Sequence, residues 1–84
     1  MDCIEATRAL FDAAGVSRAP RYGDNLLEFI ASVNIATKHG AQLAPAVADE
    51  VEDLARRMLR PDSRSTEELL TKIRALRKRH AATS

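Results

Sequence analysis

The chain has 84 residues, of which 45% are hydrophobic and 30% charged, and its formal net charge is +1 at pH 7. These values are typical of one folded domain; they exclude a largely disordered chain, and a charge this close to zero excludes binding of a polyanion by the molecule as a whole. Trp is absent and only 4% of residues are aromatic, so the core must come from Leu, Ile, Val and Ala, which favours packed helices. We therefore expect a single helical domain over residues 1–80, followed by a frayed tail at 81–84.

The first predicted helix covers residues 2–14 and has both a start and a stop signal. Asp2 and Glu5 have the spacing of a capping box, in which each side chain accepts a hydrogen bond from the backbone N–H of the other residue. Gly15 fits the left-handed position that ends many helices. The apolar side chains between these signals share one face, which predicts an amphipathic helix with a single buried side.

The second predicted helix, 24–39, has two apolar faces, with Asp24 as its expected N-cap and Gly40 as its stop. The first stripe contains Leu26, Phe29, Ile30, Val33 and Ala36. The second stripe contains Leu27, Ala31 and Ile35, at positions i, i+4 and i+8. A helix that is apolar nearly all round is normally buried, so the second stripe must meet other helices of the bundle or a partner. Because each of the other helices offers one apolar face, coverage inside the bundle is the favoured interpretation, and a partner surface is the alternative.

The third predicted helix, 45–60, opens with Pro45, since proline is favoured at the first helical position. Its early outer face carries the four acids Asp49, Glu50, Glu52 and Asp53. They spread around the solvent face, and no apolar enclosure would separate their pKa values, which argues against a catalytic or metal-binding cluster. The alternative to plain solvation is an acidic patch that binds a basic partner.

The fourth predicted helix, 66–80, begins at a second capping box formed by Ser65 and Glu68. Its basic end, together with the loop after the first helix, makes up a candidate basic surface of Arg18, Arg21, Arg74, Arg77, Lys78 and Arg79. Such a set can contact phosphates. The cations form a collar around the helix end, however, and no aromatic side chain is interleaved to stack on bases. A solvated helix end is the favoured interpretation, ahead of partner docking and nucleic-acid contact.

No arrangement of residues in the sequence indicates catalysis or a bound cofactor. The three glycines do not form a phosphate-binding loop, and neither Cys3 nor His39 has a second ligand at metal-binding spacing. A domain of this size also offers little concave volume for a substrate. We therefore expect no enzymatic activity, no metal and no cofactor.

The single cysteine, Cys3, excludes an internal disulfide and is typical of a reducing compartment. Asp2 and Glu5 stand where a secretory signal would carry positive charge, and no apolar run reaches the ~20 residues of a membrane span. We therefore expect a cytoplasmic protein without a membrane partner.

These features predict an all-α fold, a small antiparallel bundle of four short helices around a central apolar helix at about 24–39. The function they favour is a non-catalytic interaction protein, an adaptor, regulator or inhibitor that binds another protein or itself through helix faces. The expected contacts are the second stripe of the central helix, supplemented by the acidic patch or by the basic end of the last helix. The alternative function is a nucleic-acid-binding regulator that uses the basic end of the last helix and the basic loop 18–21. The sequence names neither the partner nor the process.

Overall fold

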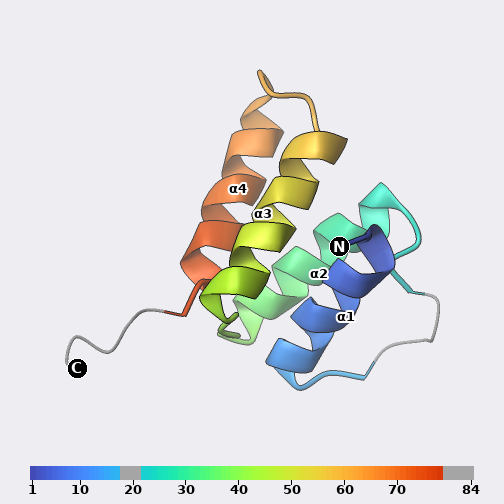
Figure 1. Cartoon of the computed structure of the whole chain (residues 1–84), viewed down its shortest axis with the longest axis vertical. Helices are drawn as coiled ribbons and strands as arrows, with labels where there is room; N and C mark the ends of the chain where they lie inside the picture. The colour runs from blue at the N-terminus through green and yellow to red at the C-terminus, as the bar shows by residue number, and fades with distance from the viewer. Residues whose placement is uncertain (18–21, 79–84) are drawn as a thin grey trace.

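The computed structural model describes residues 1–17 and 22–78, and within them four helices form a small all-α bundle (Figure 1). The helices are α1 (Cys3–Ala14), α2 (Leu26–Lys38), α3 (Pro45–Met58) and α4 (Arg64–Leu76). The helix pairs that pack together are α1 with α2, α2 with α4, α4 with α3, and α3 with α1. The predicted all-α bundle of four short helices is confirmed.

The direction of α1 departs from the predicted antiparallel order. The three helices α2, α3 and α4 alternate in direction, whereas α1 and α2 run the same way (Figure 1). Cys3 Sγ, at the start of α1, donates a hydrogen bond to the carbonyl of Asn25 at the start of α2 (3.6 Å), so both N-termini lie at one end of the bundle. An extended chain covers about 3.3 Å per residue, so the segment between Gly15 and Asn25 is long enough to return along the ~18 Å of α1.

The predicted ends of α1 are confirmed. Asp2 Oδ1 accepts a hydrogen bond from the Glu5 N–H (2.8 Å), and Glu5 Oε1 accepts one from the Asp2 N–H (2.9 Å). Gly15 has a φ of 69°, and the N–H of Val16 donates to the carbonyl of Phe11 (3.1 Å). This is the Schellman arrangement that satisfies the last carbonyls of a helix.

The N-cap of α2 is Asn25, one residue after the predicted Asp24. Asn25 Oδ1 accepts a hydrogen bond from the Glu28 N–H (2.9 Å). The Glu28 carboxylate in turn accepts hydrogen bonds from the N–H groups of Gly23 (2.8 Å) and Asp24 (3.2 Å). Because Glu28 Oε1 takes up the Asp24 N–H, Asp24 belongs to the turn before the helix. The stop at Gly40 is confirmed, with the Gly40 N–H donating to the Thr37 carbonyl.

The structure confirms Pro45 as the first residue of α3, but α4 differs from the prediction at both ends. The predicted capping box at Ser65 is wrong, because Ser63 is the N-cap and its Oγ accepts a hydrogen bond from the Ser65 N–H (3.2 Å). The helix ends at Leu76 and not at residue 80. The Leu43 N–H donates to the Leu76 carbonyl, and the Lys78 N–H donates to the Leu43 carbonyl (2.7 Å each). This isolated bridge holds the chain after α4 in an extended conformation beside the link between α2 and α3.

The core lies between the four helices and includes the fully buried side chains of Leu10, Phe29, Val33, Val51 and Ile73. The expectation that other helices would cover the second stripe of α2 is wrong at Leu27, which is 78% exposed. The main neighbours of α2 are α1 and α4, so its outer face stays at the surface. Ala31 and Ile35 are half-buried.

Candidate interaction surface

A hollow of about 170 Å³ lies between α2 and α4, next to the residue that follows α3. We call it the α2/α4 groove; it is lined by Ile30, Asn34, Leu59, Ser65, Glu68, Leu69 and Lys72. Leu69 is buried, and Ile30 and Leu59 are partly buried against the core, so these three side chains form an apolar floor. Asn34, Glu68 and Lys72 are exposed and form a polar rim.

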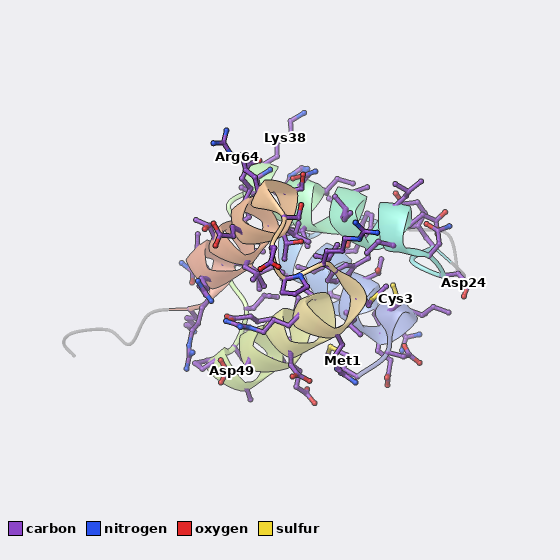
Figure 2. All side chains as sticks on the ribbon, turned by 90° about the horizontal axis from the view of Figure 1, so that it is seen from above. Met1, Cys3, Asp24, Lys38, Asp49 and Arg64 are labelled. Carbon is purple, nitrogen blue, oxygen red and sulfur yellow. The ribbon has the colours of Figure 1, made fainter. Side chains whose placement is uncertain are left out.

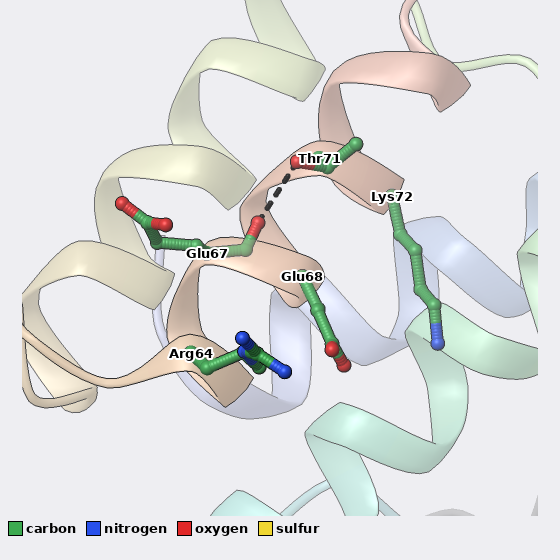
Figure 3. Close-up of a pocket in the computed structure, with 5 residues that line it drawn as sticks. All are labelled: Arg64, Glu67, Glu68, Thr71 and Lys72. Carbon is green, nitrogen blue, oxygen red and sulfur yellow. Dashed lines mark hydrogen bonds between the residues drawn. The ribbon is translucent and has the colours of Figure 1, made fainter.

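The rim links the two helices. Lys72 Nζ donates a hydrogen bond to Asn34 Oδ1 (2.8 Å), which joins α4 to α2. Glu68 and Lys72 lie one turn apart on α4, and Figure 3 shows both side chains extending from that helix in a similar direction. A second, more open hollow of about 520 Å³ runs along the outer face of α4 and shares these two residues; Arg64, Glu67 and Thr71 complete its lining. The rim of the groove therefore continues into an open surface with charges of both signs.

Leu27 lies on the same side of α2 as the groove. Leu27, Ile30 and Asn34 are spaced i, i+3 and i+7, and such positions share one face of a helix. A large, exposed apolar side chain therefore lies on the face of α2 that lines the groove. Ala31 and Ile35, predicted to act with Leu27, lie further around α2 and are not groove-lining residues.

Sequence analysis missed Ile30, Asn34 and the residues contributed by α4. The sequence pattern places Ile30 in the buried stripe, and Asn34 has no apolar character that would mark it. The spacing of Leu27, Ile30 and Asn34 is readable in the sequence. Which side of α2 would face α4 is not readable, because the two helices are separated by the whole of α3.

The predicted acidic patch pairs largely within the chain. The Glu52 carboxylate binds the guanidinium groups of Arg56 (3.0 Å) and Arg74 (3.1 Å), and Asp49 binds Arg77 (2.8 Å). The hydrogen bond from Arg74 is the main cause that lowers the pKa of Glu52 below its usual value. Burial opposes this effect, and the hydrogen bond from Arg56 lowers the pKa by a smaller amount. These contacts join α3 to α4 and to the residue after it.

The remaining two acids of the patch are exposed on the outer side of α3. Asp53 pairs with Arg57, one turn further along the same helix (3.1 Å). Glu50 has no ion-pair partner among the residues that the structure describes. Plain solvation, with pairing inside the chain, accounts for most of the patch.

The predicted basic surface is only partly described. Arg74 and Arg77 take part in the ion pairs with α3, and Lys78 is exposed just beyond the bridge to Leu43. Arg18, Arg21 and Arg79 lie outside the described residues. In the described part of the chain, the structure therefore places two of the predicted cations against acidic side chains of α3.

Cys3 is in an environment that suppresses thiolate formation. Burial raises the pKa of its thiol, and the nearby carboxylates of Asp2, Asp24 and Glu28 raise it further. Across residues 1–17 and 22–78, no three His, Cys, Asp or Glu side chains are grouped so that they could hold a metal ion. None of the helices in those ranges combines the length and apolar character needed to cross a membrane.

No protein-family model, curated protein or solved structure matches this chain. Its function is therefore inferred from the geometry of the α2/α4 groove and of Leu27.

Proposed function

We propose that the protein is a non-catalytic interaction protein, an adaptor, regulator or inhibitor, that binds a protein partner at the α2/α4 groove. The observation that carries the proposal is that Leu27 is 78% exposed on the face of α2 that also carries Ile30 and Asn34, which line a hollow with an apolar floor. A single exposed Leu is ordinary on a protein surface. Leu27 shares its face of α2 with a groove that has an apolar floor and a polar rim, however, and exposed apolar surface rimmed by polar residues is typical of interaction sites.

The size of the groove supports a protein partner over a small-molecule substrate. Its volume of about 170 Å³ is below the ~300–1,000 Å³ that is typical of sites for small ligands and cofactors. The adjoining hollow of about 520 Å³ reaches that range, but it is open and its lining residues are all polar, whereas sites for small ligands are mostly apolar. The α2/α4 groove suits one inserted side chain. A groove between two helices is also a common receptor for an amphipathic helix.

The compartment and the nucleic-acid alternative rest on separate observations. The cytoplasm is proposed as the compartment because Cys3 is the only cysteine, so the chain cannot form an internal disulfide. The nucleic-acid alternative has less support than partner binding, because Arg74 and Arg77 are engaged by Glu52 and Asp49.

Photo-crosslinking in the cells that make the protein tests the proposal. A photoreactive amino acid replaces Arg64, an exposed residue on the α4 side of the surface, or Ala46, an exposed residue of α3 that serves as the matched control. We expect a protein adduct from position 64 and no adduct from position 46. The adduct from position 64 should be lost when Leu27→Asp is added. The Leu27→Asp change should leave the fold intact because the side chain is largely exposed.

The absence of an adduct at position 64, or an adduct that persists with Leu27→Asp, would contradict the proposed function. A parallel measurement addresses the alternative. If Arg77→Gln with Lys78→Gln abolishes retention of the protein on a nucleic-acid column, while Leu27→Asp has no effect on the adduct, the nucleic-acid function is favoured.

A further inference from the structure

We propose that residues 22–25 form a strap that holds the start of α2 on α1, and that this strap opens as a unit while the rest of the bundle stays folded. Opening releases the first turn of α2, which carries Leu27, so the strap controls whether Leu27 is presented on the face of α2 that lines the groove. The inference rests on the proposed function, because it describes the regulation of the same surface. It is carried by the packing of a glycine turn over a buried hydroxyl group that has no hydrogen-bond partner.

Two weak contacts fasten the strap to α1. The Cys3 thiol donates a hydrogen bond to the Asn25 carbonyl (3.6 Å), and a thiol is a weak donor. The rings of Phe11 and Tyr22 meet edge to face, with 5.3 Å between their centroids, and such a pair adds only modestly to the free energy of burial. The strap is therefore held on α1 by side-chain contacts, whereas each helix is held by a regular series of backbone hydrogen bonds.

The strap is continuous with the first turn of α2. The Asn25 carbonyl accepts a hydrogen bond from the Phe29 N–H (3.0 Å), and Asn25 Oδ1 accepts one from the Glu28 N–H (2.9 Å). The Phe29 side chain is fully buried in the core, so a strap that lifts away from α1 separates Asn25 from it. The two hydrogen bonds that start α2 then break, and the turn that carries Leu27 loses its cap.

The closed strap buries a hydroxyl group that has no partner. Gly23 is buried against Thr7, since a Cβ atom added to Gly23 would collide with the Thr7 side chain. Thr7 is fully buried, and its Oγ1 has no hydrogen-bond partner among the residues that the structure describes. Such a group has given up its hydrogen bonds to water without gaining any from the protein, which is unfavourable. Water reaches Thr7 Oγ1 when the strap opens, so this unfavourable contribution biases the strap toward the open state.

Native-state hydrogen exchange of the isolated chain at low urea concentrations tests the inference. One reporter is the Phe29 N–H, which is bonded to the Asn25 carbonyl. The other is the Ala31 N–H, which in an α-helix is bonded to the Leu27 carbonyl. We expect both amides to exchange through one local opening, at a lower free energy than the amide of Val51 in the middle of α3, which exchanges through global unfolding.

Two variants separate opening of the strap from fraying of a helix end. Thr7→Val removes the unpaired hydroxyl and keeps the shape of the side chain, so it should slow exchange at Phe29 and Ala31 by about 5-fold or more. Fraying of α2 alone would not respond to this change on α1. The matched control is Thr37→Val near the other end of α2, where the hydroxyl donates a hydrogen bond to the Val33 carbonyl (2.9 Å). The control should leave the exchange rate at Phe29 unchanged, and circular dichroism establishes that both variants are folded.

An exchange rate at Phe29 that Thr7→Val does not lower would overturn the inference. A slower rate at Phe29 that Ala31 does not share would also overturn it, because the opening would then not reach Leu27. The measurement needs no partner, so its outcome is independent of the crosslinking experiment. If position 64 gives its adduct and the exchange rates do not respond, the strap inference fails and the proposed function stands. If the rates respond as expected and no adduct forms, the strap opens but the proposed function fails.

Discussion

At the scale of single residues, Gly23 combines an unusual backbone conformation with close packing. Its φ is +101°. A Cβ atom added to Gly23 would lie 2.7 Å from Cγ2 of Thr7 and would therefore collide with this buried side chain. Thr7 Oγ1 has no hydrogen-bond partner in the part of the chain that the structure describes. The turn before α2 therefore packs directly against α1. Figure 2 shows Cys3, at the start of α1, and Asp24, in this turn, on the same side of the molecule.

We predict that Gly23→Ala lowers the free energy of unfolding by about 3 kcal/mol or more, since backbone strain and overpacking act together. The matched control is Gly15→Ala. Gly15 also has a positive φ, but nothing lies within 4 Å of the position of its Cβ, so only the conformational cost of about 1–2 kcal/mol is expected. Urea unfolding measures both values. Similar losses at the two glycines would contradict the contact with Thr7.

At the scale of the helices, the N-terminal ends of α2 and α3 differ in capping, and this difference is testable. Asn25 caps α2 through its side chain, whereas Ala44 precedes α3 without a side-chain hydrogen bond. We predict that Asn25→Ala lowers the free energy of unfolding by about 1 kcal/mol, that Asn25→Ser largely retains it, and that Ala44→Ser raises it by about 0.5–1 kcal/mol. Thermal and urea unfolding report these changes. Full stability in Asn25→Ala would mean that Asn25 is not the cap.

The helix ends show which structural features can be predicted from sequence. The ends at Asp2, Gly15, Gly40 and Pro45 depend on residues within one turn of one another, and all four were predicted correctly. The end of α4 depends on the backbone of Leu43, which is distant in the sequence. No local pattern around Leu76 encodes that contact, so the predicted helix continued to residue 80.

The candidate site was predictable only in part for the same reason. Leu27 stands out in the sequence because it lies off the first apolar stripe of α2. The groove needs Asn34 and Lys72 side by side, and these residues are 38 positions apart. Sequence periodicity shows that α2 has surplus apolar surface, but it does not show which of its sides packs against α4.

At the scale of the whole molecule, the ion pairs between α3 and α4 make stability depend on pH. The folded-state pKa of Glu52 is lowered, chiefly by Arg74. The contribution of this carboxylate is therefore complete above its unfolded-state pKa and is lost as the pH falls through the lower folded-state value. We predict that the free energy of unfolding decreases as the pH is lowered below about 4.5, and that Glu52→Gln makes this decrease smaller.

Urea unfolding at a series of pH values checks this prediction. Arg74→Gln should reduce the pH dependence as well, because it removes the main cause of the lowered pKa. Arg57→Gln is the matched control, since Arg57 pairs with Asp53 and not with Glu52. A pH profile that is the same in Glu52→Gln and in the natural chain would contradict the assignment.

The bridge between Leu43 and the chain after α4 also determines how the molecule bears mechanical load. A pull on the C-terminal end reaches the Lys78 N–H before it reaches the last turn of α4, and that N–H is bound to the Leu43 carbonyl (2.7 Å). The tension therefore passes into the link between α2 and α3, and α4 is protected from unwinding at its end until the bridge breaks. A domain fused after residue 84 would pull on the middle of this chain as well as on its last helix.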